Sequence, residues 1–224
     1  MPHVISVNLG RATAVPYTAA PGGLTGIGKR PAEGPVQVAV PGPRGAAGSG
    51  LAGDAVCDLR VHGGDDQAVY AYAREDLDRW ERELDRTLTP GMFGENLTTT
   101  GIDVNEALIG ERWRIGGQVE LEVTSGRIPC RTFAGWLDVS GWVKRFTQEA
   151  RPGPFFRVLT PGPIEAGDPI TVLSRPDHEV TVAFLFRAMT TEPGLLPRVM
   201  AAEDTLNASY AEDIRARLAR TASG

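Results

Sequence analysis

The stretch SGRIPCRTF (residues 125–133) places one of the chain's two cysteines, Cys130, between Arg127 and Arg131. A thiolate is a nucleophile and a soft metal ligand, and neighbouring cations favour the thiolate over the thiol. Pro129 restricts the backbone immediately before the cysteine. This pattern predicts metal or sulfur chemistry at Cys130, although a cysteine taken alone is more often an inert, buried small residue.

Three other stretches carry side chains that could serve such a site. TGIGKRP places Lys29 after a flexible pair of glycines, DLRVHGG ends an expected strand with His62, and FGENL puts Glu95 and Asn96 after a glycine. Lysine, histidine and asparagine donate hydrogen bonds to anions and polar rings. Each residue also has an ordinary explanation, as a solvated lysine, a strand-end histidine or a turn asparagine. The four stretches become a site only if the fold brings them together.

The elements that must position these residues are mostly short strands. Segments of β-branched or alternating residues, separated by Gly, Pro, Asn and Asp, predict a barrel or sandwich; they are VISVNL, PVQVAV, DLRV, QAVYAY, RWRI, QVELEV, FFRVLT and PITVL. A first helix is expected over 74–88, where apolar residues recur three or four apart, and the TPG at 89–91 ends it. A second helix is expected over 140–150.

The pattern changes to helical spacing near Arg175. Thr181 is the expected N-cap of one helix, residues 194–204 offer a second short helix, and Ser209 has capping-box spacing for a third. The chain is therefore expected to divide into a mainly β domain, residues 1–175, and a helical domain, residues 176–224.

Composition excludes several function classes. The net charge of -5 argues against a nucleic-acid partner, and no run of about 18 apolar residues is present to cross a membrane. Two cysteines, with no signal-peptide pattern at residues 1–17, predict a cytoplasmic protein. Residues 48–53 formally match a dinucleotide fingerprint. That fingerprint requires a helix directly after it, but here DAVCDLRV follows, which is expected to form a strand. The scattered cysteines and histidines lack the ligand spacing of a zinc site.

In this order the stretches resemble the MOSC domain family, named for the C-terminal domain of molybdenum-cofactor sulfurases, and especially its bacterial YiiM-like members. The similarity covers most of the chain, in family order: TGIGKRPAEGPV, GLAGDAVCDLRVHGGDDQAVYAY, FGENLTTTGI, IGERWRIGGQVELEV, GRIPC, FFRVL and IEAGDPI. The resemblance implies a mainly β fold, a MOSC-type β-barrel with flanking helices and a small C-terminal three-helix domain.

The resemblance also implies a function. Cys130 would ligate the metal of a molybdenum-pterin cofactor (Mo-molybdopterin), with no role for pyridoxal phosphate. Lys29 and Arg127 would contact its phosphate or pterin, and His62 and Asn96 would hydrogen-bond the cofactor or substrate. The reaction would be reduction of small N-hydroxylated compounds such as N-hydroxylaminopurines. Electrons would come from a separate flavin or iron-sulfur reductase, because the chain has no motif for either group.

The sequence departs from the family pattern beside the expected pocket. Ser125 and Gly126 stand where YiiM-like proteins usually carry Gln and Pro, and Val56 stands where Gln is frequent. Cys57 matches no motif position and is expected to be a packed strand residue.

Two other functions stay open from the sequence. Cys130 could carry a persulfide as a sulfur carrier or sulfurtransferase, which needs the same nucleophilic thiolate without a metal. The barrel could also be a non-catalytic module for a small acidic ligand or a partner protein. The sequence leaves the oligomeric state open, a homodimer included.

Overall fold

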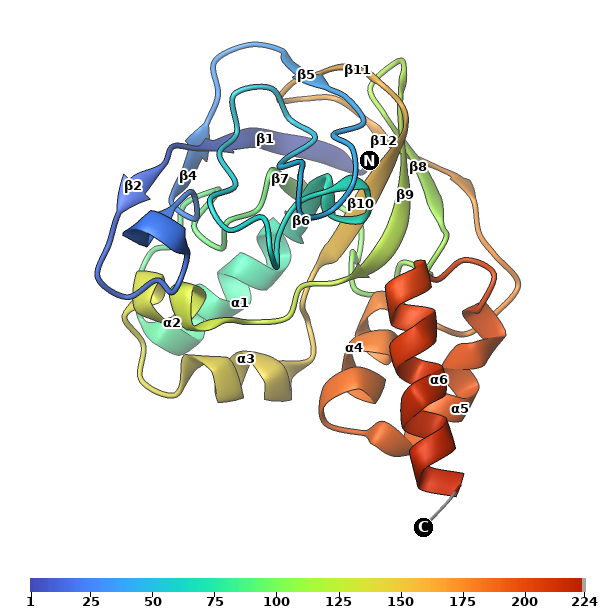
Figure 1. Ribbon diagram of the computed structural model, residues 1–224. Coiled ribbons are helices and arrows are strands. Elements are labelled where there is room, and N and C mark those ends of the chain that lie inside the picture. The colour runs from blue at the N-terminus through green and yellow to red at the C-terminus, as the bar shows by residue number, and fades with distance from the viewer. Residues whose placement is uncertain (223–224) are drawn as a thin grey trace.

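An eight-stranded mixed sheet forms the body of the protein in the computed structural model, which describes residues 1–222 (Figure 1). The strands lie in the order β12 (Ile170–Ser174), β8 (Arg112–Ile115), β9 (Val119–Gly126), β10 (Pro154–Thr160), β6 (Val69–Ala73), β7 (Leu97–Thr100), β1 (His3–Gly10) and β4 (Lys29–Pro31). The pair β6–β7 is parallel, and the other pairs of this sheet are antiparallel. Alternating burial along β1 and β10 explains why their β-branched and aromatic residues form strands, and β6 is buried throughout.

The expected β-barrel is not closed in the described residues, because the main sheet ends at β12 on one side and at β4 on the other. The sheet nevertheless curls until the start of β1 reaches the chain just before β12. There His3 bridges Pro169, the Val4 N–H donates to the Asp168 carbonyl at 2.9 Å, and the Ile170 N–H donates to the Pro2 carbonyl at 3.0 Å. Pro169 and Pro2 lack an N–H, so a continuous ladder cannot form across this seam.

Two small sheets complete the β structure. β5 (Val36–Val38) pairs with β11 (Gly162–Ile164), and β2 (Thr13–Ala14) pairs with β3 (Leu24–Thr25).

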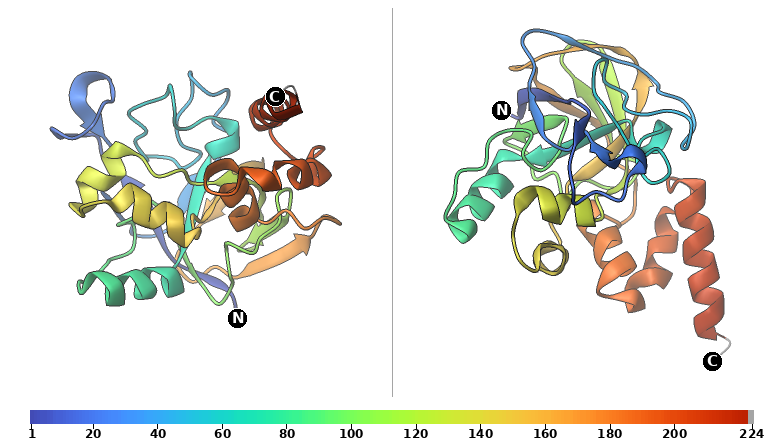
Figure 2. Two further views of the ribbon diagram at one scale, coloured as in Figure 1. Left: turned by 90° about the horizontal axis from the view of Figure 1, so that it is seen from below. Right: turned by 60° about the vertical axis from the view of Figure 1, so that its left-hand side comes forward.

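Three helices cover one side of the sheet around an aromatic cluster (Figure 2). They are α1 (Arg74–Leu84), α2 (Arg131–Leu137) and α3 (Trp142–Glu149). The expected helices over 74–88 and 140–150 correspond to α1 and α3, but α1 ends at Leu84 because Asp85 takes a left-handed φ of 49°. The aromatic members of the cluster are Tyr70, Tyr72, Trp80, Phe93, Phe133, Trp142 and Phe146.

The C-terminal part is helical, as expected. It contains α4 (Val182–Thr190), α5 (Leu196–Val199) and α6 (Ala208–Ala222), with 3-10 turns at Pro193–Leu195 and Met200–Ala202. Thr181 caps α4, since the Phe184 N–H donates to its hydroxyl at 3.1 Å. The expected Ser209 cap of α6 is wrong. Asn207 accepts from the Tyr210 N–H at 2.9 Å and takes that role.

These helices share one apolar core with the sheet, because Val182, Leu185 and Ile214 belong to the same buried cluster as Val123. The division at residue 175 stays a prediction. Among the described residues, no helix is both long and apolar enough to cross a membrane.

Candidate cofactor site

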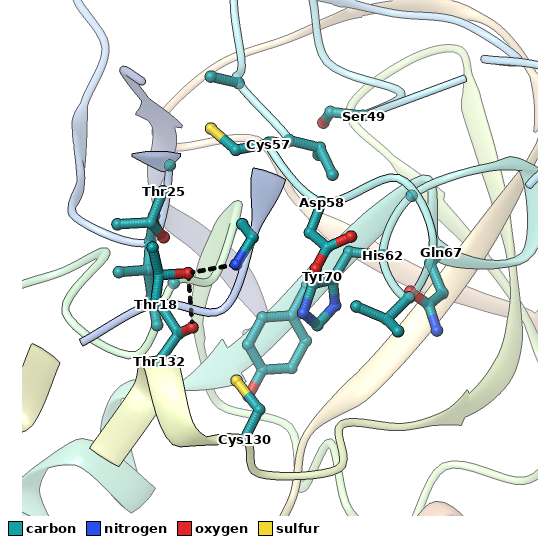
Figure 3. A pocket seen from close by; sticks show the side chains of 18 of the residues that line it. Thr18, Thr25, Ser49, Cys57, Asp58, His62, Gln67, Tyr70, Cys130 and Thr132 are labelled. Atoms are coloured by element: carbon teal, nitrogen blue, oxygen red, sulfur yellow. Dashed lines mark hydrogen bonds between the residues drawn. The ribbon is translucent and has the colours of Figure 1, made fainter. Parts of the chain in front are cut away.

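All five predicted site residues line one cavity of about 370 Å³, a volume within the range of about 300–1,000 Å³ typical of small-molecule sites. They are Lys29, His62, Asn96, Arg127 and Cys130. In Figure 3 the Cys130 side chain points into this space on the side of Tyr70, while Cys57 lies across the view. The fold therefore brings the four separated stretches together.

The glycines before Lys29 are close-packed, which corrects the expected flexible pair. A Cβ atom on Gly26 would overlap the Ala55 carbonyl oxygen, and one on Gly28 would lie 2.8 Å from the Trp136 ring. Neither glycine needs a left-handed φ. These residues are small because two other segments approach their backbone, and that approach fixes where Lys29 enters the cavity.

Residues 54–62 form an irregular loop, so the strand expected over DAVCDLRV and ending at His62 is wrong. The left-handed Gly53, with a φ of 82°, turns the chain into this loop. The loop begins with Asp54, whose carboxylate is hydrogen-bonded by another segment. Along the loop, Cys57 is half-buried and lines the cavity instead of packing in a strand. Burial raises the pKa of the Cys57 thiol, and nearby Lys29 opposes this shift.

One wall of the cavity is a closed polar network around Asp54. This carboxylate forms an ion pair with Lys29 and accepts the Gly10 N–H at 2.7 Å and the Asn96 side-chain amide at 2.8 Å. The Asn96 Oδ1 in turn accepts the Tyr70 N–H at 3.1 Å. Burial lowers the pKa of Lys29, and the Asp54 carboxylate opposes this shift. Asn96 is thus engaged by protein groups and orients Asp54.

Glu95 stabilises the FGENL turn, residues 93–97, through buried hydrogen bonds. It is fully buried, and it accepts the N–H groups of Gly91 at 2.6 Å and Phe93 at 3.0 Å and the Thr98 hydroxyl at 2.9 Å. Burial raises the pKa of Glu95, while these hydrogen bonds lower it. Its role is to shape the turn that presents Asn96.

A second wall of the cavity carries Arg127, a buried cation without an acidic partner in residues 1–222. Only 8% of Arg127 is exposed, and its Nη1 donates to the Phe93 carbonyl at 2.8 Å. Its guanidinium lies 4.4 Å from the Phe133 ring centroid and 5.1 Å from that of Tyr70. Its buried Nε has no hydrogen-bond partner in this part of the chain. An uncompensated buried cation of this kind favours an anionic ligand.

Cys130 follows on the same wall, directly before α2, a helix that the sequence did not predict. α2 carries Gly135, and a Cβ atom there would lie 2.5 Å from Tyr17, so packing requires a residue of low helix propensity. The Cys130 thiol is free and partly buried. Arg131, the next residue, is exposed and also lines the cavity.

His62 completes this wall as an uncharged ring. Burial, reinforced by the Arg127 charge, lowers its pKa from 6.5 to about 4. At neutral pH the imidazole is therefore a neutral donor and acceptor.

The cavity combines a free thiol with an excess of positive charge, although the whole chain is acidic. Four basic side chains and two acidic ones line it: Lys29, Arg60, Arg127, Arg131, Asp54 and Asp58. Among the described residues, no group of three or more His, Cys, Asp and Glu could hold a metal ion by itself. The donor set suits an anionic organic cofactor whose own atoms supply most of the metal ligands, with one thiolate from the protein.

Comparison with known proteins agrees with this site. The family model for the MOSC domain matches residues 58–171. This chain belongs to the MOSC domain family. The crystal structure of YiiM from Geobacillus stearothermophilus superposes with a TM-score of 0.77 at 26% identity, covering 97% of this chain and 100% of that one. The YiiM-like resemblance is confirmed.

Two sequence relatives extend the comparison. The uncharacterized protein YflK from Bacillus subtilis (strain 168) is 34% identical over 184 residues, which are 82% of this chain and 79% of YflK. A protein named "Reductase" from Gibberella moniliformis is 33% identical over 138 residues, 60% of this chain but 24% of that protein.

Proposed function

We propose that this MOSC protein is a molybdenum-cofactor-dependent reductase of N-hydroxylated compounds such as N-hydroxylaminopurines. The observation that carries the proposal is the pairing, on one cavity wall, of the free Cys130 thiol with the uncompensated Arg127 cation. A molybdenum-pterin cofactor offers both complements, a metal for the thiolate and a phosphate for the guanidinium. The reductase-named relative supports the same reaction class.

The chain's own residues supply binding, orientation and hydrogen bonds. Arg127 would hold the cofactor's anionic group and Cys130 the metal, while Lys29, held by Asp54, would add positive charge to the wall that faces the cofactor's polar edge. When bound, the cofactor supplies two-electron chemistry at molybdenum. His62, uncharged at neutral pH, can hydrogen-bond the reacting N–O group without placing a second positive charge beside Arg127. Asn96 acts indirectly by orienting Asp54.

The overall reaction cleaves the N–O bond. One hydroxylamine, two electrons and two protons give one amine and one water. The electrons would come from a separate flavin or iron-sulfur reductase, because the sequence carries no recognisable motif for either group.

The test is metal analysis of protein produced in a host that makes the cofactor. Wild type is expected to carry roughly one molybdenum per chain and to reduce 6-N-hydroxylaminopurine with a dye reductant, because one thiolate serves one metal centre. Cys130→Ala should lose both properties. Cys57→Ala is the matched control, since Cys57 lines the same cavity, and it should keep the metal. Metal-free wild type carrying a persulfide on Cys130 would instead support a sulfur carrier.

A further inference from the structure

A second cavity of about 530 Å³ adjoins the cofactor site. Its far wall comes from the C-terminal helices, through Met189 and Thr190 of α4 and Ser209, Tyr210 and Asp213 of α6. Residues Val61, His62, Gln67, Arg127, Cys130 and Phe155 line both cavities. Cys130 and His62 therefore lie at the junction between the two spaces.

A hydrogen bond joins α4 to α6, and both helices belong to the helical C-terminal part of the chain (Figure 1). The Arg217 Nη1 donates to the Met189 carbonyl at 3.2 Å, at the C-terminal end of α4. The Arg217 Nη2 also pairs with Asp213 at 2.9 Å, so a cation already lies beside this carboxylate of the cavity lining. The wall is thus preorganised and carries no unpaired negative charge toward a ligand.

The surfaces facing this space suit a flat ring. Tyr210 and Phe155 offer aromatic faces, and Met189 and Ile128 offer apolar edges, Ile128 being 44% exposed at the rim. The Gln67 Oε1 is buried without a hydrogen-bond partner among the described residues, so it calls for an N–H donor. These features fit a heteroaromatic amine.

The charges disfavour a cationic guest. Arg44 and Arg127 contribute positive charge, and His62 is uncharged at neutral pH. Asp213 is the acidic residue among the described residues that line this cavity, and it already pairs with Arg217, so the lining favours a neutral guest over a cation.

We infer that the second cavity is the substrate-binding half of the site, and that Tyr210 determines its specificity for neutral, flat, heteroaromatic N-hydroxylated amines. The inference rests on the proposed function. A cofactor in the first cavity would have its cysteine ligand at the junction, so a ring lying against Tyr210 would occupy a space that Cys130 also lines. The C-terminal helices thereby form part of the active site.

Binding to the full-length chain isolated without the cofactor tests this inference separately from the reductase activity. Adenine, the expected product of 6-N-hydroxylaminopurine, is titrated calorimetrically into wild type and variants. Tyr210→Ala should weaken adenine binding by about tenfold, the loss expected for one aromatic contact, whereas Tyr210→Phe should stay within about twofold. Glu212→Ala, on the exposed face of the same helix, is the matched control and should bind as wild type does. Cationic benzamidine should bind wild type about tenfold more weakly than adenine.

A second variant covers the case in which Tyr210→Ala does not fold. Ser209→Trp adds bulk at an exposed position on the cavity rim and should also weaken adenine binding by at least about tenfold. Adenine affinity unchanged in both variants, or no adenine binding by wild type, would overturn the inference. In cofactor-loaded protein, Tyr210→Ala should lower kcat/KM for 6-N-hydroxylaminopurine while molybdenum content stays at the wild-type value. Absence of metal and activity in wild type would instead refute the proposed function.

Discussion

The two walls of the cofactor cavity differ in how their polar groups are satisfied. On the Asp54 wall, Lys29, Asp54 and Asn96 bind one another and the backbone. On the Arg127 wall, the guanidinium has no acidic partner among the described residues, and the Cys130 thiol is free. The motif residues therefore fall into two groups. Those on the Asp54 wall hold the site together, and those on the Arg127 wall are available to bind a ligand. Substitutions on the first wall should act on stability, and substitutions on the second on binding.

The largest effect on stability is expected for Asp54→Ala. It leaves Lys29 buried without its counter-ion and removes the acceptor of two further donors, so the free energy of unfolding should fall by about 3–5 kcal/mol. Denaturant titration measures the change. Asp78→Ala breaks the exposed Arg74–Asp78 pair and, as the control, should change stability by less than about 0.5 kcal/mol. Equal losses in the two variants would contradict the closed network.

A smaller loss, about 2–3 kcal/mol, is expected for Asn96→Leu, which leaves the buried Tyr70 N–H and one Asp54 oxygen without a partner. Molybdenum per folded chain should be unchanged, because Asn96 serves Asp54 and not the ligand. If Asn96→Leu keeps the stability of wild type but loses the metal, Asn96 contacts the ligand, as proposed for the residues of the Arg127 wall.

On the Arg127 wall, His62 predicts a pH effect. Its folded pKa of about 4 lies below the unfolded value of 6.5, so the unfolded chain binds the extra proton. The contribution to stability is complete above pH 6.5 and is lost as the pH falls toward 4. Between pH 7 and pH 5 wild type should lose about 2 kcal/mol more than His62→Gln. Parallel stability curves for the two proteins would show that His62 is not buried as a neutral ring.

The smallest change in stability is expected for Arg127→Met, within about 1 kcal/mol of wild type, because an unpaired buried cation is replaced by an apolar side chain that still packs on Phe133 and Tyr70. The molybdenum content per chain, which measures cofactor retention, should nevertheless fall close to zero. Arg86→Met removes a similar arginine-to-carbonyl hydrogen bond, to Leu137, away from the cavity, and should retain the metal. A large stability loss without metal loss would make Arg127 a structural residue.

The sequence predicted most of the elements because their local signals agree with their packing. The helix capped by Thr181 and the alternating strands β9 and β10 are examples. The segment at 54–62 alternates like a strand but joins no sheet of the described residues, and hydrogen bonds to Asp54 decide its path. Helix α2 was missed because Gly135 is a poor helix former, retained there to make room for Tyr17.

For the site, the sequence predicted which residues meet but not the role of each. Motif order named the five residues that meet in the cavity, but pairwise contacts divided their roles. Asp54 lay in the GLAGD stretch of the family resemblance without an assigned role, and Cys57 matched no motif position. Barrel closure was also beyond the sequence, since it depends on how far the sheet curls before Pro169 meets β1.

The aromatic support of Arg127 has a mechanical consequence. Phe133, which stacks on the guanidinium, lies in the first turn of α2, three residues after Cys130. A displacement of α2 therefore carries the sulfur and the aromatic face beneath the cation together. The spacing between the thiol and the aromatic ring that supports the cation is therefore set by the first turn of α2.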